Sequence, residues 1–151
     1  MLHINVASLR FGDGLAEPSL PDISLYITTD AISLRDLIAR SVEEQIAKLL
    51  DEHQKTASQT LALLERQYFD NDELAKQATS GKIAMPSNRV ADAANGKIET
   101  AREIKRATQA FQAGKYKIFV NGREYVELDE TISLTEGMKI NFIRLMPLVG
   151  G

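Results

Sequence analysis

Apolar residues recur with the period of a strand at both ends of the chain and with the period of a helix between them. Leu2, Ile4 and Val6 alternate with polar or smaller residues, and a similar alternation runs through residues 23–28. Further along, apolar residues lie three or four positions apart on one helical face: Leu34, Ile38, Val42, Ile46, Leu49 and Leu50. The sequence therefore predicts an α+β protein in which strands from both ends flank a helical middle.

The first helix is expected to be unusually long. Ser33, with Asp36 three residues later, resembles a capping box and indicates that the helix begins at residue 34. Neither glycine nor proline occurs again before residue 70, so nothing in the sequence is predicted to stop the helix. We therefore expect one continuous helix over residues 34–69.

Residues 70–96 are the least regular part of the sequence. We predict an irregular connection there, with a short helical piece at 73–79. A second long helix is expected over 97–113, followed by Gly114 as its C′ residue. The two helical stripes are expected to pack against each other, and any part that stays exposed is a candidate surface for homo-oligomers. These stripes comprise Leu61, Leu64 and Tyr68 and, in the second helix, Ile98, Ile104 and Phe111.

The last third of the chain returns to strands. Residues 116–120 and 123–126 flank Asn121-Gly122, a dipeptide typical of a type I′ hairpin turn. A final strand is predicted over 139–145, and the chain then runs through Pro147 to Gly150-Gly151.

Composition excludes several classes of function. With 18 basic and 21 acidic residues the formal charge is −3, so no basic patch for nucleic acid or anionic lipid is expected, and a protein is the expected partner. The absence of cysteine excludes disulfides, a thiolate nucleophile and sulfur-ligated metals. No apolar run is long enough for a signal peptide or a membrane span, so we expect a soluble, cytoplasmic protein.

No motif indicates catalysis, a metal or a cofactor. His3 and His53 are the only histidines, and they lack metal-ligand spacing. Gly12-Asp13-Gly14 is not part of a phosphate-binding loop motif, and adjacent acidic pairs such as Glu43-Glu44 diverge on a helix. We therefore expect neither an enzyme nor a metal or cofactor site.

The C-terminal part of the chain, about residues 115–151, resembles the ends of the MoaD and ThiS sulfur carriers and of ubiquitin-like proteins. The resemblance lies in the hairpin Phe119-Val120-Asn121-Gly122-Arg123, the turn Leu134-Thr135-Glu136-Gly137-Met138, the strand Ile140-Asn141-Phe142 and the tail Pro147-Leu148-Val149-Gly150-Gly151. It implies a single β-grasp domain over 1–151, in which a mixed sheet from about 1–33 and 115–151 wraps a helix. Residues 51–114 are then a helical insertion without counterpart in the small sulfur carriers. The tail also departs from the family, which carries a proline pair nearer the strand.

The resemblance implies that the terminal carboxylate is the reactive group. An E1-like enzyme with bound ATP would adenylate Gly151, while Gly150 gives clearance because it has no Cβ. Pro147 would keep the tail extended, so that Leu148 and Val149 lead into the enzyme. We expect a ubiquitin-like modifier that is joined to a target amine, with an E2-like enzyme and an isopeptidase as further partners. The alternatives are a sulfur carrier acting through a thiocarboxylate and a self-assembling structural protein.

Overall fold

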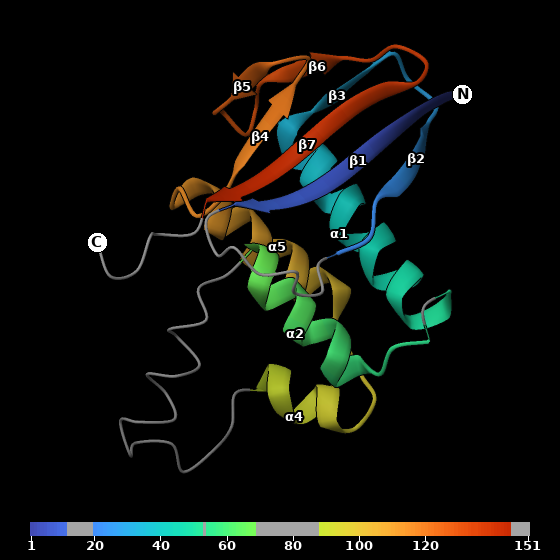
Figure 1. The fold of residues 1–151 in the computed structure, drawn as a ribbon, viewed down its shortest axis with the longest axis vertical. Coiled ribbons are helices and arrows are strands. Elements are labelled where there is room, and N and C mark those ends of the chain that lie inside the picture. The colour runs from blue at the N-terminus through green and yellow to red at the C-terminus, as the bar shows by residue number, and fades with distance from the viewer. Residues whose placement is uncertain (12–19, 53, 69–87, 146–151) are drawn as a thin grey trace.

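The computed structural model describes residues 1–11, 20–52, 54–68 and 88–145. Within these ranges the protein is α+β, with a mixed five-stranded sheet, a two-stranded sheet and four helices (Figure 1). Strands come from both ends of the chain and the helices from its middle, as the apolar periods predict.

The large sheet has its first and last strands side by side at its centre. The strand order is β2-β1-β7-β4-β5, with β1 and β7 parallel and every other pair antiparallel. Its strands are β1 (Leu2–Phe11), β2 (Ile23–Ile27), β4 (Lys117–Val120), β5 (Arg123–Tyr125) and β7 (Met138–Leu145).

A second, two-stranded sheet was not predicted. β3 (Ala31–Ser33) and β6 (Thr131–Ser133) pair in antiparallel register, with Ile32 opposite Ile132. Each strand has three residues, of which one side chain is buried. Strands this short do not show an alternation of apolar and polar residues that could be recognised in the sequence.

The predicted helix ends at Ser33 and Gly114 are confirmed. The Ser33 hydroxyl accepts a hydrogen bond from the Asp36 amide at the start of α1 (Leu34–Asp51). Gly114 has a φ of 77° after α5 (Thr100–Gln112), where its amide donates to Phe111.

The prediction of one continuous helix over 34–69 is wrong. α1 ends at Asp51, and α2 runs over Ala57–Tyr68. A capping box explains why a new helix begins at residue 57. The Thr56 hydroxyl accepts a hydrogen bond from the backbone amide of Gln59, and the Gln59 side-chain oxygen accepts one from the backbone amide of Thr56. A further helix, α4 (Asn88–Ala94), lies where an irregular connection was predicted. The helical piece predicted at 73–79 lies outside the described residues.

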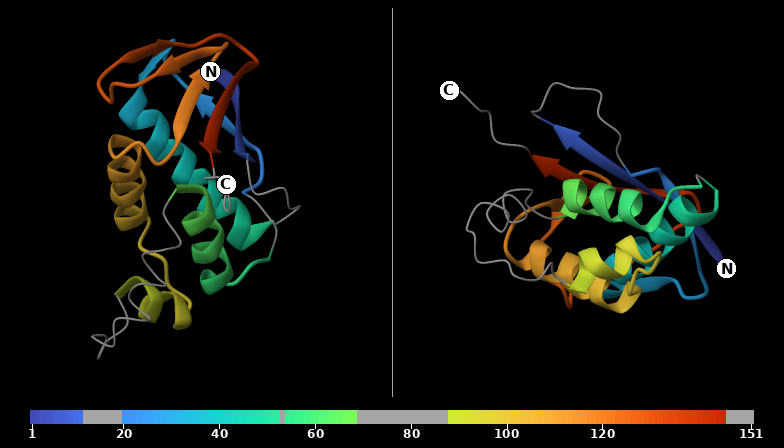
Figure 2. Two further views of the ribbon diagram at one scale, coloured as in Figure 1. Left: turned by 60° about the vertical axis from the view of Figure 1, so that its left-hand side comes forward. Right: turned by 90° about the horizontal axis from the view of Figure 1, so that it is seen from below.

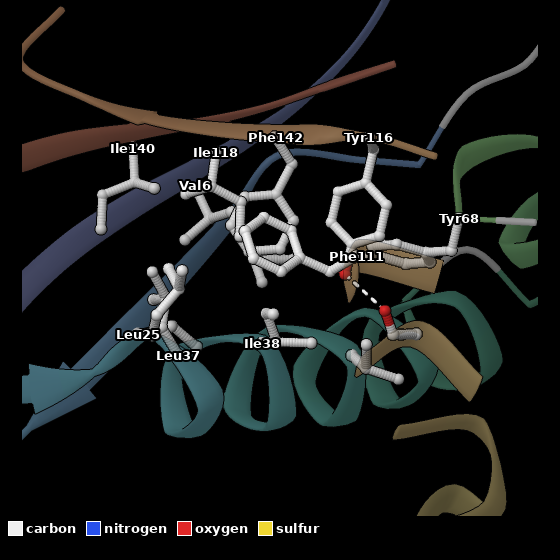
Figure 3. Packing of buried hydrophobic residues seen from close by; sticks show 14 of the residues in the cluster. Val6, Leu25, Leu37, Ile38, Tyr68, Phe111, Tyr116, Ile118, Ile140 and Phe142 are labelled. Atoms are coloured by element: carbon white, nitrogen blue, oxygen red, sulfur yellow. Dashed lines mark hydrogen bonds between the residues drawn. The ribbon is translucent and has the colours of Figure 1, made fainter. Parts of the chain in front are cut away.

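α1, α2 and α5 cover the same face of the large sheet, and α4 lies farther from it (Figures 1 and 2). The helices and the sheet share one apolar cluster. Figure 3 shows four aromatic rings at its centre: Tyr68, Phe111, Tyr116 and Phe142. The Tyr68 and Tyr116 ring centroids are 5.0 Å apart, and those of Tyr116 and Phe142 are 6.0 Å apart. Of the two predicted helical stripes, Leu64, Tyr68 and Phe111 join this main core, and Ile98 and Ile104 pack against it. Leu61 lies instead in a smaller cluster with Ala57 and Ala93, against which Ile98 also packs.

Several polar groups in this core form hydrogen bonds. The Tyr68 hydroxyl donates to the Gln45 side-chain oxygen, and the Gln45 amide group donates to the Ser8 hydroxyl at 3.0 Å. The Tyr116 hydroxyl donates to the Ala107 carbonyl at 2.7 Å. Burial raises the pKa of both tyrosine hydroxyls well above the usual value. Both tyrosines therefore remain protonated donors at neutral pH.

We expect Gly122→Ala to destabilise the β4–β5 hairpin. Asn121 and Gly122 have φ angles of 52° and 81°, as the predicted type I′ turn requires. A Cβ at Gly122 meets no atom within 4 Å, so the cost is conformational and should be about 1 kcal/mol in urea unfolding. Asn121→Gly should change the free energy of unfolding much less. Equal losses from both substitutions would contradict this explanation.

Candidate functional site

The candidate site begins at the end of β7, because the predicted reactive tail follows directly. β7 pairs in parallel with β1 as far as Phe11 and Leu145. On its other side β4 pairs with β7 only as far as Ile143, opposite Lys117. Within the described strands, Arg144 and Leu145 therefore have β1 alone as a neighbour.

The five residues predicted for the tail lie outside the described residues. They are Pro147, Leu148, Val149, Gly150 and Gly151. The structure describes the strand that precedes them and the surfaces on both sides of its end.

One face of the sheet carries no described helix, and an apolar patch lies on it beside the end of β7. Ile118 and Phe142 are fully buried beneath the helices, so the adjacent Phe119 and Ile143 face the other way. Ile143 is opposite Leu9 of β1, which is 36% exposed. We call Leu9, Phe119 and Ile143 the open-face patch.

Charged side chains border the open-face patch. Lys117 lies opposite Ile143 and forms an ion pair with Glu124 at 3.8 Å, while Glu124 lies opposite Phe119. Lys139 continues the same face along β7, four residues before Ile143. An apolar centre with a charged border is the arrangement found in many protein–protein interfaces.

On the opposite face, α2 reaches the end of β7. The Gln67 side-chain amide donates to the Phe142 carbonyl at 3.3 Å, and the Tyr68 ring contacts the Phe142 ring edge-on with centroids 6.3 Å apart. The Arg144 side chain is only 7% exposed. Sequence reasoning identified Tyr68 as part of an apolar stripe but missed Gln67 and Arg144, because nothing local marks a polar side chain that will be buried by a distant strand.

A second polar cluster joins α2, α4 and α5. Arg89 donates two hydrogen bonds to the Glu103 carboxylate at 2.9 and 2.6 Å and forms an ion pair with Glu65. All three side chains are buried, and Arg106 lies 3.5 Å from Glu65. Each carboxylate therefore has a cationic partner, and the cluster connects α2, α4 and α5.

Burial and these partners act on the pKa of Arg89 in opposite directions. Burial by itself lowers the pKa of the guanidinium, but the hydrogen bonds to Glu103 and the negative charges of Glu65 and Glu103 outweigh it. The net effect raises the pKa of Arg89 above its usual value. Arg89 therefore stays charged at neutral pH.

The remaining candidates are placed as follows. His3 lies on the open face of the sheet, where its ring stacks on Tyr26 with centroids 5.1 Å apart. His53 and the Gly12–Gly14 segment lie outside the described residues. Across the described ranges, no group of three or more histidine, aspartate or glutamate side chains is arranged to bind a metal. None of the described helices combines the length and the apolar character needed to cross a bilayer.

No protein-family model, curated protein or solved structure matches the chain. We therefore infer function from the strand order, the residues around the end of β7 and the tail sequence.

Proposed function

We propose that the chain is a β-grasp protein modifier whose Gly151 carboxylate is adenylated by an E1-like enzyme and joined to an amine on a target protein. The observation that carries the proposal is the central parallel pair of β1 and β7 in a mixed sheet that packs on α1. A mixed sheet that wraps one helix is the arrangement implied by the resemblance of the C-terminal sequence to the ubiquitin-like proteins.

This topology supports a tail that acts at a distance. Gly151 follows Leu145, the last residue of β7, by six positions. An extended segment of that length spans about 20 Å, enough to enter an active site in another protein. Two terminal glycines keep the end of such a segment thin, since neither has a Cβ.

The open-face patch supports a docked partner. Leu9, Phe119 and Ile143 are apolar, partly exposed and close to the point where the tail begins. An enzyme that covers this patch would be held beside the root of the tail, which raises the effective concentration of the carboxylate at its ATP site. We therefore assign the open-face patch to the activating enzyme.

The chemistry requires activation because a free carboxylate is a poor acyl donor. A carboxylate oxygen of Gly151 attacks the α-phosphorus of ATP, and pyrophosphate leaves. The resulting mixed anhydride is attacked at its carbonyl carbon by the target amine, so that an amide forms, AMP leaves and the amine loses a proton. All of these groups except the carboxylate belong to partner proteins or ATP, and the chain itself is a substrate.

The self-assembly alternative has little surface on the predicted stripes. Of the six candidate residues, Leu61, Leu64, Tyr68 and Phe111 are buried within the chain, and Ile98 and Ile104 are only partly exposed. The sulfur-carrier alternative uses the same tail and differs only in the nucleophile that attacks the adenylate. It is separated from the modifier by the products of one experiment.

That experiment incubates the purified protein with ATP, a sulfide source, candidate target proteins and the E1-like enzymes of its host, one enzyme at a time, and weighs the intact products. Addition of one AMP followed by linkage to protein supports the modifier. Replacement of one terminal oxygen by sulfur identifies a carrier instead. No ATP-dependent product with any of these enzymes would contradict both, and a variant lacking Gly150-Gly151 serves as the negative control.

The docking assignment is tested with a matched pair of surface variants. Ile143→Ser changes the open-face patch, whereas Val126→Ser changes an exposed apolar residue after β5 that is outside the patch. In the adenylation assay we expect about a tenfold higher KM for Ile143→Ser, since the loss of a buried aliphatic contact at an interface costs 1 kcal/mol or more. An unchanged KM for Ile143→Ser, or an equal rise for Val126→Ser, would contradict the docking assignment.

A further inference from the structure

We propose that α2 is a brace for the end of β7, and that Gln67 is a positioning residue for the segment from which the tail begins. α2 belongs to the helical region without counterpart in the small sulfur carriers. The brace gives this helical region a specific role, which is to support the end of β7.

The end of β7 needs support because its pairing is incomplete. β4 reaches only as far as Ile143, so β1 is the one described strand neighbour of Arg144 and Leu145. Strand ends paired on one side open more readily than strands paired on both sides. Fraying here would move the starting point of any tail that follows.

The last two residues of α2 act on a single rung of the central parallel pair. Ser8 and Phe142 are direct neighbours in the register of β1 and β7. Gln67, which is 1% exposed, donates to the Phe142 carbonyl. Tyr68 reaches the other member of the rung through Gln45, whose side chain is bonded to both the Tyr68 hydroxyl and the Ser8 hydroxyl.

Aromatic packing between α2 and β7 also supports the end of β7. Tyr68 is fully buried and lies edge-on to Phe142, and the Tyr116 ring contacts both, edge-on to Tyr68 and stacked on Phe142 (Figure 3). α2 therefore holds both the backbone and the side chain of Phe142, three residues before β7 ends. Displacement of α2 would release both contacts together.

The consequence for the tail rests on the proposed function, whereas the brace itself does not. If Gly151 is adenylated, a fixed end of β7 limits the directions in which the tail can enter the enzyme. Loss of the brace would then lower kcat for adenylation and leave KM unchanged, because the open-face patch lies on the other side of the sheet.

The test is amide hydrogen exchange on Gln67→Met, which keeps the volume of the side chain and removes its donor. We expect the amides of Ile143, Arg144 and Leu145 to exchange about tenfold faster, because a buried carbonyl loses its donor. The amides of β2, at the edge of the sheet, should follow the change in global stability measured by urea unfolding. If Gln67→Met does not fold, Gln67→Asn keeps the amide but shortens its reach by one methylene.

Thr60→Val is the matched control in the same helix. Thr60 is fully buried, and its hydroxyl has no hydrogen-bond partner among the described residues. Its replacement should leave exchange at the end of β7 unchanged. The brace is disproved if Gln67→Met leaves exchange at 143–145 as slow as in the parent protein, or speeds it no more than in β2. These outcomes need no partner enzyme, so they are independent of whether Gly151 is activated.

Discussion

Arg89→Met should lower the free energy of unfolding by about 3–5 kcal/mol, the usual cost of removing one partner from a buried ionic cluster. The Glu65 and Glu103 side chains are 2% and 1% exposed, and Arg89 is the cation bonded most closely to both. Without it, two carboxylates remain buried between α2 and α5 with weaker partners. Urea unfolding followed by circular dichroism measures the loss.

Arg102→Met is the matched control for this prediction. Arg102 pairs most closely with the more exposed Asp92, at 3.1 Å, lies 3.8 Å from the Glu103 carboxylate, and has a side chain that is 25% exposed. Solvent screens such a pair, and its loss should cost about 1 kcal/mol or less. Similar losses for the two variants would show that burial of Arg89 does not determine its contribution.

Phe142→Ala should cost about 3–5 kcal/mol, as for other large aromatic residues removed from a packed core. Phe142 is fully buried in the central strand β7, and its ring contacts Tyr68 from α2 and Tyr116 at the start of the C-terminal strands. Because it lies between the sheet and the helices, both should unfold in one transition. Circular dichroism and tyrosine fluorescence should therefore give the same midpoint.

Phe119→Ala removes the same side chain from the opposite face of the sheet. Phe119 is only partly buried, in the open-face patch, and we expect a loss of about 1 kcal/mol. Separate transitions by the two probes in Phe142→Ala, or equal losses at the two positions, would contradict a core shared by the helices and the sheet.

Local signals in the sequence predicted the elements that depend on few residues. Asn121-Gly122 supports its turn through two positive φ angles, and Ser33 caps α1 through a hydrogen bond three residues away. Neither glycine nor proline marks the break between α1 and α2, so the absence of these residues does not predict a continuous helix. The local signal for the break is the capping box of Thr56 and Gln59, which starts α2.

Other features depend on contacts that no short window contains. Arg89 is bonded to Glu103, 14 residues away, and to Glu65 across a part of the chain where an irregular connection with one short helical piece was predicted. The Gln67 side chain meets the Phe142 carbonyl 75 residues further along the chain. A buried polar residue on an amphipathic helix looks like any other polar residue until its partner strand is known. The candidate site was therefore predicted from its tail sequence, while the surfaces around the end of β7 required the structure.

The two faces of the sheet at the end of β7 suit two different roles, docking of a partner and support of the strand. The open-face patch is exposed and apolar, as a docking surface requires, and the helix-covered face is packed and hydrogen-bonded, as a support requires. Under the proposed function, the open-face patch would bind the activating enzyme, and the helix-covered face would hold the strand that leads to Gly151. The helical region then contributes to the reaction without containing a reactive group.

The proposed conjugation produces a branched tryptic peptide that mass spectrometry detects directly. Trypsin cleaves after Arg144, so a target lysine joined to Gly151 would keep the branch Leu145-Met146-Pro147-Leu148-Val149-Gly150-Gly151. We predict that tryptic digests of cells expressing the protein contain lysines with this branch, and that cells expressing the chain without Gly150-Gly151 do not. Recovery of the tail only as an unbranched peptide, under conditions in which the protein is active, would contradict the account.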